Sequence, residues 1–275
     1  MISANTKTTE SASAPFELPP RRVILLGASN LTRGIATVVD ACHRLWGGPL
    51  DLLAALGHGR SYGATSRVLG RRLPGILQCG IWSAARARPQ APTAALVTDI
   101  GNDLLYESSV DTIARWVTQS LDELLALDAR IVMTRLPIGN IEGLAEWKFR
   151  MLRRVMFPKG RLPLSAIAER ARELDARLVE AATARRIQMV ELTPEWYGFD
   201  PIHIKPSCWP TAWHEILRRW SDAEDAPTPA RGGWDLRRWL YLLSLAPEQR
   251  SFLGKERHCQ QPCGKLSEGT VVSYY

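Results

Sequence analysis

The stretch VILLGASNLTRG, residues 23–34, has the residue types and spacing of a reactive site. Its apolar run stops at Gly27, turns through Ala28 and Ser29, and resumes with helical spacing. A serine at this junction places its hydroxyl at the rim of a sheet, beside backbone N–H groups that have no intrahelical partners. Because α/β enzymes keep their nucleophiles at such positions, Ser29 is a candidate nucleophile.

Three further polar segments follow predicted strands. They are GHGRSYGATS (57–66), TDIGND (98–103) and DPIHIKPSCW (200–209). In the last segment Asp200 and His203 stand three residues apart on one loop, so the carboxylate can meet an imidazole N–H and fix its tautomer. A hydroxyl, a glycine backbone, a carboxamide and an Asp–His pair are together the parts of a serine acyl hydrolase.

Short apolar runs alternate with helical patterns and would position these groups. The expected strands are Val23–Leu26, Leu50–Leu56, Ala94–Thr98, Ile131–Leu136 and Ile187–Leu192. The expected helices run from Leu31 to Leu45, from Ile113 to Leu127 and from Leu164 to Ala182, and Gly47-Gly48 ends the first. This alternation predicts a doubly wound, mostly parallel sheet with helices on both faces. Ligands bind at the carboxyl ends of such strands, where the four polar segments converge.

The four segments, in this order, resemble the motif blocks of the SGNH (GDSL-type) hydrolases over about residues 22–220. The matching residues are Ser29 in GASN, Gly63 in SYGATS, Asn102 in GND, and Asp200 and His203 in DPIH. The resemblance implies an α/β fold, a flavodoxin-like three-layer α/β/α sandwich with a mostly parallel five-stranded sheet. It implies hydrolysis of esters or thioesters, with Ser29 as nucleophile and His203 as general base oriented by Asp200. It also implies an oxyanion hole formed by the Ser29 and Gly63 backbone N–H groups and the Asn102 side chain.

Two positions depart from the family pattern. The usual Gly-Asp-Ser is Gly27-Ala28-Ser29 in this chain, so a carboxylate that normally supports the nucleophile turn is missing. The second block offers Gly57, Gly59 and Gly63 as the oxyanion glycine. Gly63 is preferred because YGATS resembles the small-residue context of the family, and Gly59 is the alternative.

Each candidate also has an ordinary structural explanation. Ser29 could be an N-cap, Asn102 could cap a turn, and His203 could be a loop histidine. The competing hypothesis is a non-catalytic flavodoxin-like binding module that uses the basic 141–161 segment and the Trp-rich C-terminal region. A nucleotide or flavin site would need a phosphate-binding loop after the first strand, and GASNLTRG is a poor one. No cofactor is expected.

The segment from Ile141 to Arg161 is expected to be one basic amphipathic helix. Its apolar stripe consists of Ala145, Phe149, Leu152 and Met156, and its cations are Lys148, Arg150, Arg153, Arg154, Lys159 and Arg161. Three interpretations are open: a lid carrying cations over the active site, a surface for an anionic partner, or a solvated face, which is the commonest role of such charges.

The composition divides the chain into three parts. Residues 1–20 are expected to be a disordered leader, 21–220 the hydrolase domain, and 221–275 a linker and a C-terminal helical extension packed on that domain. The helix WDLRRWLYLLSL is expected to dock on the last helix of the main domain through tryptophans. Cys259 and Cys263 with His258 lack an obvious fourth ligand for structural zinc, so no metal site is expected.

Charge and hydropathy restrict the partners. The net charge is +7, but residues 221–275 carry seven Lys+Arg and seven Asp+Glu, so this region is not a nucleic-acid arm. The sequence has no run of roughly 20 apolar residues and no secretory signal, which predicts a cytoplasmic protein without a membrane span. Five cysteines do not describe a disulfide framework. A small-molecule ester is the expected partner; acyl specificity and oligomeric state stay open.

Overall fold

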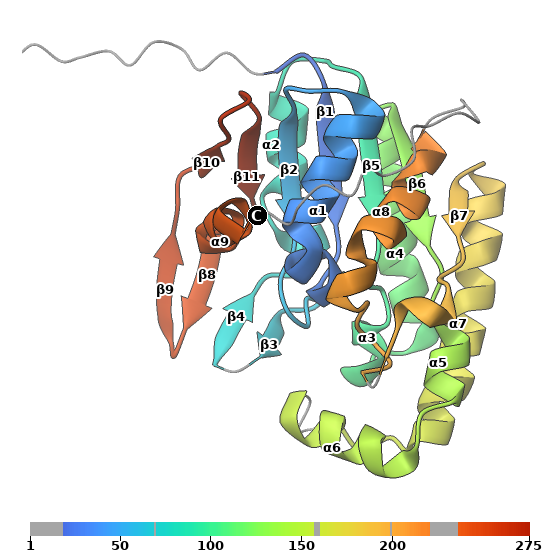
Figure 1. Ribbon diagram of the computed structural model, residues 1–275. Coiled ribbons are helices and arrows are strands. Elements are labelled where there is room, and N and C mark those ends of the chain that lie inside the picture. The colour runs from blue at the N-terminus through green and yellow to red at the C-terminus, as the bar shows by residue number, and fades with distance from the viewer. Residues whose placement is uncertain (1–18, 69, 157–159, 199, 221–235) are drawn as a thin grey trace, which may run out of the picture.

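A seven-stranded sheet in the order β10-β11-β2-β1-β5-β6-β7 forms the centre of the computed structural model, which describes residues 19–68, 70–156, 160–198, 200–220 and 236–275 (Figure 1). The strands are β1 (Arg22–Leu26), β2 (Asp51–Ala55), β5 (Thr93–Val97), β6 (Ala129–Thr134), β7 (Gln188–Val190), β10 (Gly264–Lys265) and β11 (Val271–Tyr274). The five strands from β2 to β7 are parallel and follow the flavodoxin-like order. The predicted three-layer α/β fold is therefore confirmed, but the sheet has seven strands instead of the expected five because β11 and β10 extend it beyond β2.

Helices cover both faces of this sheet (Figure 1). One face carries α1 (Ser29–Trp46), α8 (Trp209–Leu217) and α9 (Leu236–Ser244), and the other carries α2 (Ile81–Ala87), α4 (Val110–Ala126) and α7 (Leu164–Ala184). Alternation along β1 explains the two cores: Val23 and Leu25 pack under the first set of helices, whereas Ile24 and Leu26 pack under the second. Each core is thus built from buried strands that are apolar on both sides.

Helix α1 positions the candidate nucleophile at its first residue. Its buried stripe includes Leu31, Ile35, Val38 and Cys42, as the spacing predicts. The helix ends at Gly47, which has φ +82° and donates its N–H to the His43 carbonyl at 3.1 Å. A left-handed residue at a helix end favours glycine because other side chains are strained there.

Three short helices stand at the carboxyl ends of the strands: α3 (Asn102–Leu105), α5 (Ile138–Glu142) and α6 (Glu146–Met156). The last two correct the expectation of one helix over 141–161. Helix α5 ends at its C-cap, Gly143, and α6 begins only at Glu146. Ala145 lies between the two helices and is exposed, so it is not part of a buried stripe. Residues 157–159, and the side chains of Leu152, Arg153 and Met156, lie outside the described part.

The C-terminal extension contributes strands as well as the expected helix. Strand β11 pairs with β2, and β8 (Gln249–Phe252) and β9 (Lys255–His258) join β3 (Ser66–Val68) and β4 (Arg71–Leu73) in a second, antiparallel sheet of order β3-β4-β8-β9. Helix α9 packs against α1, where Trp239 Nε1 donates to the Arg33 carbonyl at 2.9 Å, and not chiefly against the last helix of the main domain as expected. Residues 1–18 of the expected leader and 221–235 of the expected linker lie outside the described residues.

No helix among the described residues has both the length and the apolar character required to cross a bilayer.

Candidate active site

Ser29, His203 and Asp200 form one continuous hydrogen-bonded chain. His203 Nε2 lies 2.9 Å from Ser29 Oγ, and His203 Nδ1 lies 2.6 Å from Asp200 Oδ2. When Nδ1 carries the proton and donates a hydrogen bond to the carboxylate, Nε2 is unprotonated and can accept a hydrogen bond from the Ser29 hydroxyl. Asp200 and His203 belong to one loop, whose ends are joined by an antiparallel bridge between Tyr197 and Ile204.

Asp99, which follows β5, supports the nucleophile turn from a neighbouring strand. Its Oδ2 accepts the backbone N–H groups of Ala28 at 2.9 Å, Asn30 at 2.9 Å and Leu31 at 3.1 Å. A carboxylate at a helix N-terminus satisfies the N–H groups that the helix cannot and is stabilised by the helix dipole. Asp99 therefore supplies the carboxylate at the N-terminus of α1, next to Ala28, which has no polar side chain.

Asn30 ties the histidine loop to the same turn. Its side-chain amide donates to Asp99 Oδ1 at 2.8 Å and to the Ile202 carbonyl at 2.9 Å, and its Oδ1 accepts the Ile204 N–H at 2.8 Å. These contacts bracket His203 in sequence, so one residue next to Ser29 fixes the backbone on both sides of His203.

Two candidate oxyanion donors lie at this site. Asp99 accepts the N–H groups on either side of Ser29, and no described group accepts the Ser29 N–H. Asn102, the first residue of α3, lines the same cavity as Ser29, and its Nδ2 donates only a long bond of 3.4 Å to the Asp99 carbonyl. Both donors can therefore turn to a substrate oxygen without losing a strong hydrogen bond.

The N–H of Gly63 already has a partner, and its Cα faces a large side chain. Its N–H donates to Ser61 Oγ at 3.2 Å, and a Cβ at this position would collide with the Trp116 ring of α4. Gly63 is buried, and its N–H is used inside its own loop. The carbonyl of Gly59, the alternative, accepts the Tyr106 hydroxyl at 2.7 Å, just after α3, and no described group accepts the Gly59 N–H.

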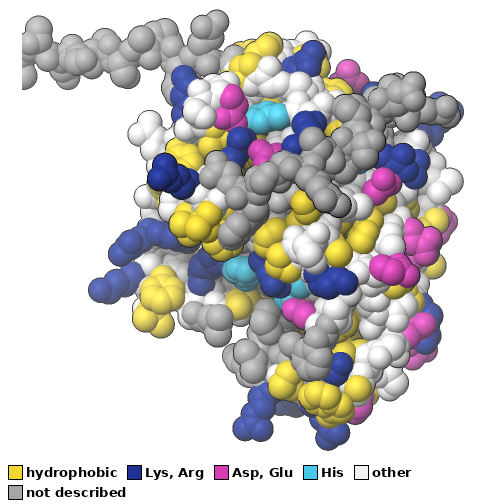
Figure 2. Space-filling model, in the orientation of Figure 1, with side chains coloured by type: hydrophobic (Ala, Val, Ile, Leu, Met, Phe, Trp, Pro, Cys, Tyr) yellow, Lys and Arg dark blue, Asp and Glu magenta, His cyan; other side chains and the backbone are white. Residues whose placement is uncertain are grey.

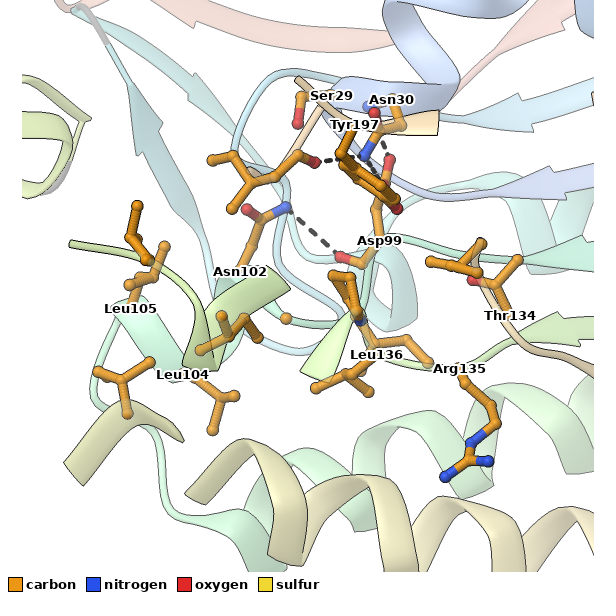
Figure 3. Close-up of a pocket in the computed structure, with 18 of the residues that line it drawn as sticks. Ser29, Asn30, Asp99, Asn102, Leu104, Leu105, Thr134, Arg135, Leu136 and Tyr197 are labelled. Atoms are coloured by element: carbon orange, nitrogen blue, oxygen red, sulfur yellow. Dashed lines mark hydrogen bonds between the residues drawn. The ribbon is translucent and has the colours of Figure 1, made fainter. Parts of the chain in front are cut away.

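A cavity runs from Ser29 between α3, α5, α6 and α7 (Figure 3). In Figure 3, Ser29, Asn30, Asp99 and Asn102 gather at one end, and Leu104 and Leu136 line the remainder. Its other apolar walls include Ile141, Leu144, Phe149, Leu164 and Ile167. Arg135 also lines the cavity, but its guanidinium is paired with Asp175 of α7. Away from the polar end, the cavity is suited to an apolar group.

Helix α6 covers part of this cavity and so has an inner and an outer side. Phe149 is buried and lines the cavity, whereas Arg150 and Arg154 are exposed. The inner side is suited to a lid, while Arg150 and Arg154 lie on the solvent side and not over Ser29.

Burial and neighbouring charges tune three groups around the site. Burial raises the pKa of Asp200, but the hydrogen bond and charge of His203 outweigh it, so the pKa lies below its usual value and the carboxyl stays ionised. Burial lowers the pKa of His58, assisted by the charges of Arg71, His203 and Arg33. Burial raises the pKa of Asp103 to about 6 despite hydrogen bonds from Ser61 and Tyr62.

Sequence reasoning missed Asp99 and Asn30, although both lie inside the quoted segments. The available signal was position: Asp99 directly follows a buried strand and lies three residues before Asn102. No group of three or more His, Cys, Asp or Glu side chains that could hold a metal ion occurs in the described ranges.

No family model matches the sequence, and no curated protein does. Among solved structures, the chain is similar to a Mycobacterium smegmatis aryl esterase, with 11% identity, 72% of this chain and 96% of that chain covered, and a TM-score of 0.49. It is also similar to the psychrotrophic esterase EstA from Pseudoalteromonas sp., with 11% identity, coverage of 72% and 97%, and a TM-score of 0.46. A third is a member of the lipolytic protein G-D-S-L family from Veillonella parvula, with 10% identity, coverage of 72% and 96%, and a TM-score of 0.46.

Proposed function

We propose that the protein is a serine hydrolase of carboxylic esters or thioesters, of the SGNH type, with its catalytic domain in residues 21–220. The observation that carries the proposal is the chain of short hydrogen bonds from Ser29 through His203 to Asp200. A serine that merely capped a helix would have no need of an imidazole at 2.9 Å whose other nitrogen is held by a carboxylate.

The first half of the reaction forms an acyl-enzyme. His203 Nε2 takes the Ser29 proton while Oγ bonds to the carbonyl carbon, and Asp200 stabilises the imidazolium that results. The negative charge on the carbonyl oxygen is met by the Ser29 N–H, the Asn102 amide and, we propose, the Gly59 N–H in place of that of Gly63. His203 then donates its proton to the leaving alcohol or thiol as the bond between carbonyl carbon and leaving atom breaks.

Water completes the cycle. His203 removes a proton from a water molecule that attacks the acyl carbon, and Ser29 Oγ leaves with that proton restored. The acyl group occupies the cavity lined by Leu104, Leu136 and Phe149, because the walls beyond the polar end are apolar.

A fluorophosphonate probe tests the nucleophile directly. Wild-type protein should be labelled, and Ser29→Ala should not; His203→Ala should label far more slowly because the hydroxyl loses its base. Ser207→Ala, an exposed serine just after the histidine loop, is the matched control and should label like wild type. Folded wild-type protein that neither labels nor cleaves a panel of short and long acyl esters would refute the proposal.

A further inference from the structure

Four cationic side chains share one face of the β3-β4-β8-β9 sheet. Successive residues of a strand alternate between faces, and directly paired residues of neighbouring strands share a face. The pairs Arg71 with Phe252, Arg250 with Arg257, and Phe252 with Lys255 therefore place the cations together. We use the name cationic strip for these four residues: Arg71, Arg250, Lys255 and Arg257.

Within the part of the chain that the structure describes, the cationic strip is not neutralised by ion pairs. Glu256, the carboxylate within these four strands, alternates onto the opposite face, and none of the four cations forms an ion pair with a described carboxylate. Several surface arginines elsewhere do form ion pairs, as Arg185 does with Asp122. Figure 2 shows Lys and Arg side chains gathered on the part of the surface where β4, β8 and β9 lie. Such a concentration of one charge attracts an anion.

The cationic strip begins at the loop that follows β2. Val68 and Leu73 share its face and pack on this loop, since a Cβ at Gly59 would meet Val68 and one at Gly57 would meet Leu73. A Cβ added to Gly57 would also lie 3.8 Å from Arg71 Nη2, so the Arg71 guanidinium reaches this loop. His58 lies between the two glycines, and the charges of Arg71, His203 and Arg33 all act on it.

The cationic strip and the apolar cavity lie on opposite sides of the carboxyl ends of the central strands (Figure 1). Figure 1 shows β8 and β9 on one side of the strand ends and α5 and α7 on the other. The leaving atom must lie beside His203, which protonates it, so an acyl group in the cavity directs the leaving group past His58. Arg33, one helical turn after Ser29 and 3.8 Å from Asp200 Oδ2, adds positive charge along this path.

We propose that the substrate's leaving group is a phosphorylated alcohol or thiol whose phosphate binds the cationic strip, beginning at Arg71. Three of the four cations are arginines, whose planar fork binds phosphate oxygens in pairs. The inference rests on the proposed esterase function and adds the substrate class: an apolar acyl group joined to a phosphate-bearing leaving group. Cleavage consumes one water and releases a carboxylic acid and the phosphorylated alcohol or thiol.

Two thioesters that differ by one phosphate test this subsite: octanoyl pantetheine and octanoyl phosphopantetheine. At low salt, the wild-type protein should prefer the phosphorylated thioester roughly tenfold in kcat/KM, mainly through KM. Arg71→Gln/Arg250→Gln should remove the preference, so that the two thioesters have equal kcat/KM. The matched control, Arg67→Gln/Arg72→Gln, removes the same charge from the opposite, exposed face and should keep the preference.

A second variant guards against misfolding. Lys255→Gln/Arg257→Gln alters two exposed residues and should weaken the preference in part. Added salt should reduce the preference in wild type and not in Arg71→Gln/Arg250→Gln. Equal kcat/KM for the two thioesters in wild type, or equal effects of substitutions on the two faces, would overturn the subsite and leave the esterase function standing. Failure to cleave either thioester or any ester would instead count against the esterase function itself.

Discussion

Asp99 and Asn30 are joined twice: Asp99 Oδ2 accepts the Asn30 backbone N–H at 2.9 Å, and Asp99 Oδ1 accepts its side-chain amide at 2.8 Å. Through the first bond Asp99 holds the turn that carries Ser29. Through the second it fixes the amide that holds the backbone beside His203. One carboxylate just after β5 thus sets the positions of Ser29 and His203 together.

Replacing Asp99 should therefore impair catalysis more than folding. Asp99→Ala should lower kcat/KM about 10²-fold, because small displacements of reacting groups cost that much, while Asp99→Asn should be intermediate since one acceptor oxygen survives. Asp128→Ala is the control, because Asp128 has a similar φ of 53° against 60° but is exposed at a turn. Ester hydrolysis and probe labelling rates measure the effect. Turnover of Asp99→Ala at the wild-type level would show that the turn holds without the carboxylate.

The Asn102 amide should act on the transition state and not on substrate binding. Asn102→Ala should reduce kcat by about 10²–10³-fold with KM nearly unchanged, the signature of a lost oxyanion donor. Steady-state kinetics with a short acyl ester separate the two constants. Asn140→Ala on α5 is a suitable comparison and should behave like wild type. A rise in KM at constant kcat would reassign Asn102 to binding.

Asp103 should make stability depend on pH between about 4 and about 6. Burial raises its pKa from 3.8 to about 6 in the folded protein, so the folded state holds a proton that the unfolded state has already released. The free energy of unfolding contributed by Asp103 is therefore fully present below pH 4 and is lost as the pH rises to about 6. Urea unfolding at several pH values should show this decline in wild type and a flatter profile in Asp103→Asn. Identical profiles for the two proteins would contradict the assignment.

The close approach of α1 and α8 should be sensitive to a single methyl group. A Cβ at Gly34 would collide with the indole nitrogen of Trp213, so Gly34→Ala should lower the free energy of unfolding by about 1–3 kcal/mol. Gly139→Ala, where no atom lies within 4 Å, should be neutral or slightly stabilising. Denaturant unfolding of the two variants measures the difference. Equal stabilities would mean that α8 can shift away from α1 at little cost.

The sequence was most informative where one physical signal dominated. The five parallel strands were predictable because each is a short buried apolar run, and α1 because its stripe repeats every three or four residues. Ser29, Asp200 and His203 could be grouped because parallel strands end at one edge of the sheet. Those signals concern single segments and do not depend on the partner that each segment meets.

The missed features depend on partners that are distant in sequence. Strands β8 and β9 read QRSF and KERH, with no apolar alternation, and form because β4 offers an edge. Gly63 was preferred as the oxyanion glycine because its sequence neighbours are small. Those neighbours do not reveal that Gly63 packs against the Trp116 ring of another helix. The sequence around Asp99 does not show that its carboxylate contacts the N-terminus of α1.

The pairing of β11 with β2 has a consequence for how the protein folds. It joins segments near the two ends of the described chain, in parallel, so the polypeptide must close a very long loop before this contact can form. Until then β2 presents an open row of backbone donors and acceptors to other chains, in a segment, DLLAA, that is fully buried in the finished sheet. Slow refolding, and aggregation at high protein concentration, should therefore originate at this edge. Pairing of Val271–Tyr274 with β2 covers the edge and should stop this aggregation.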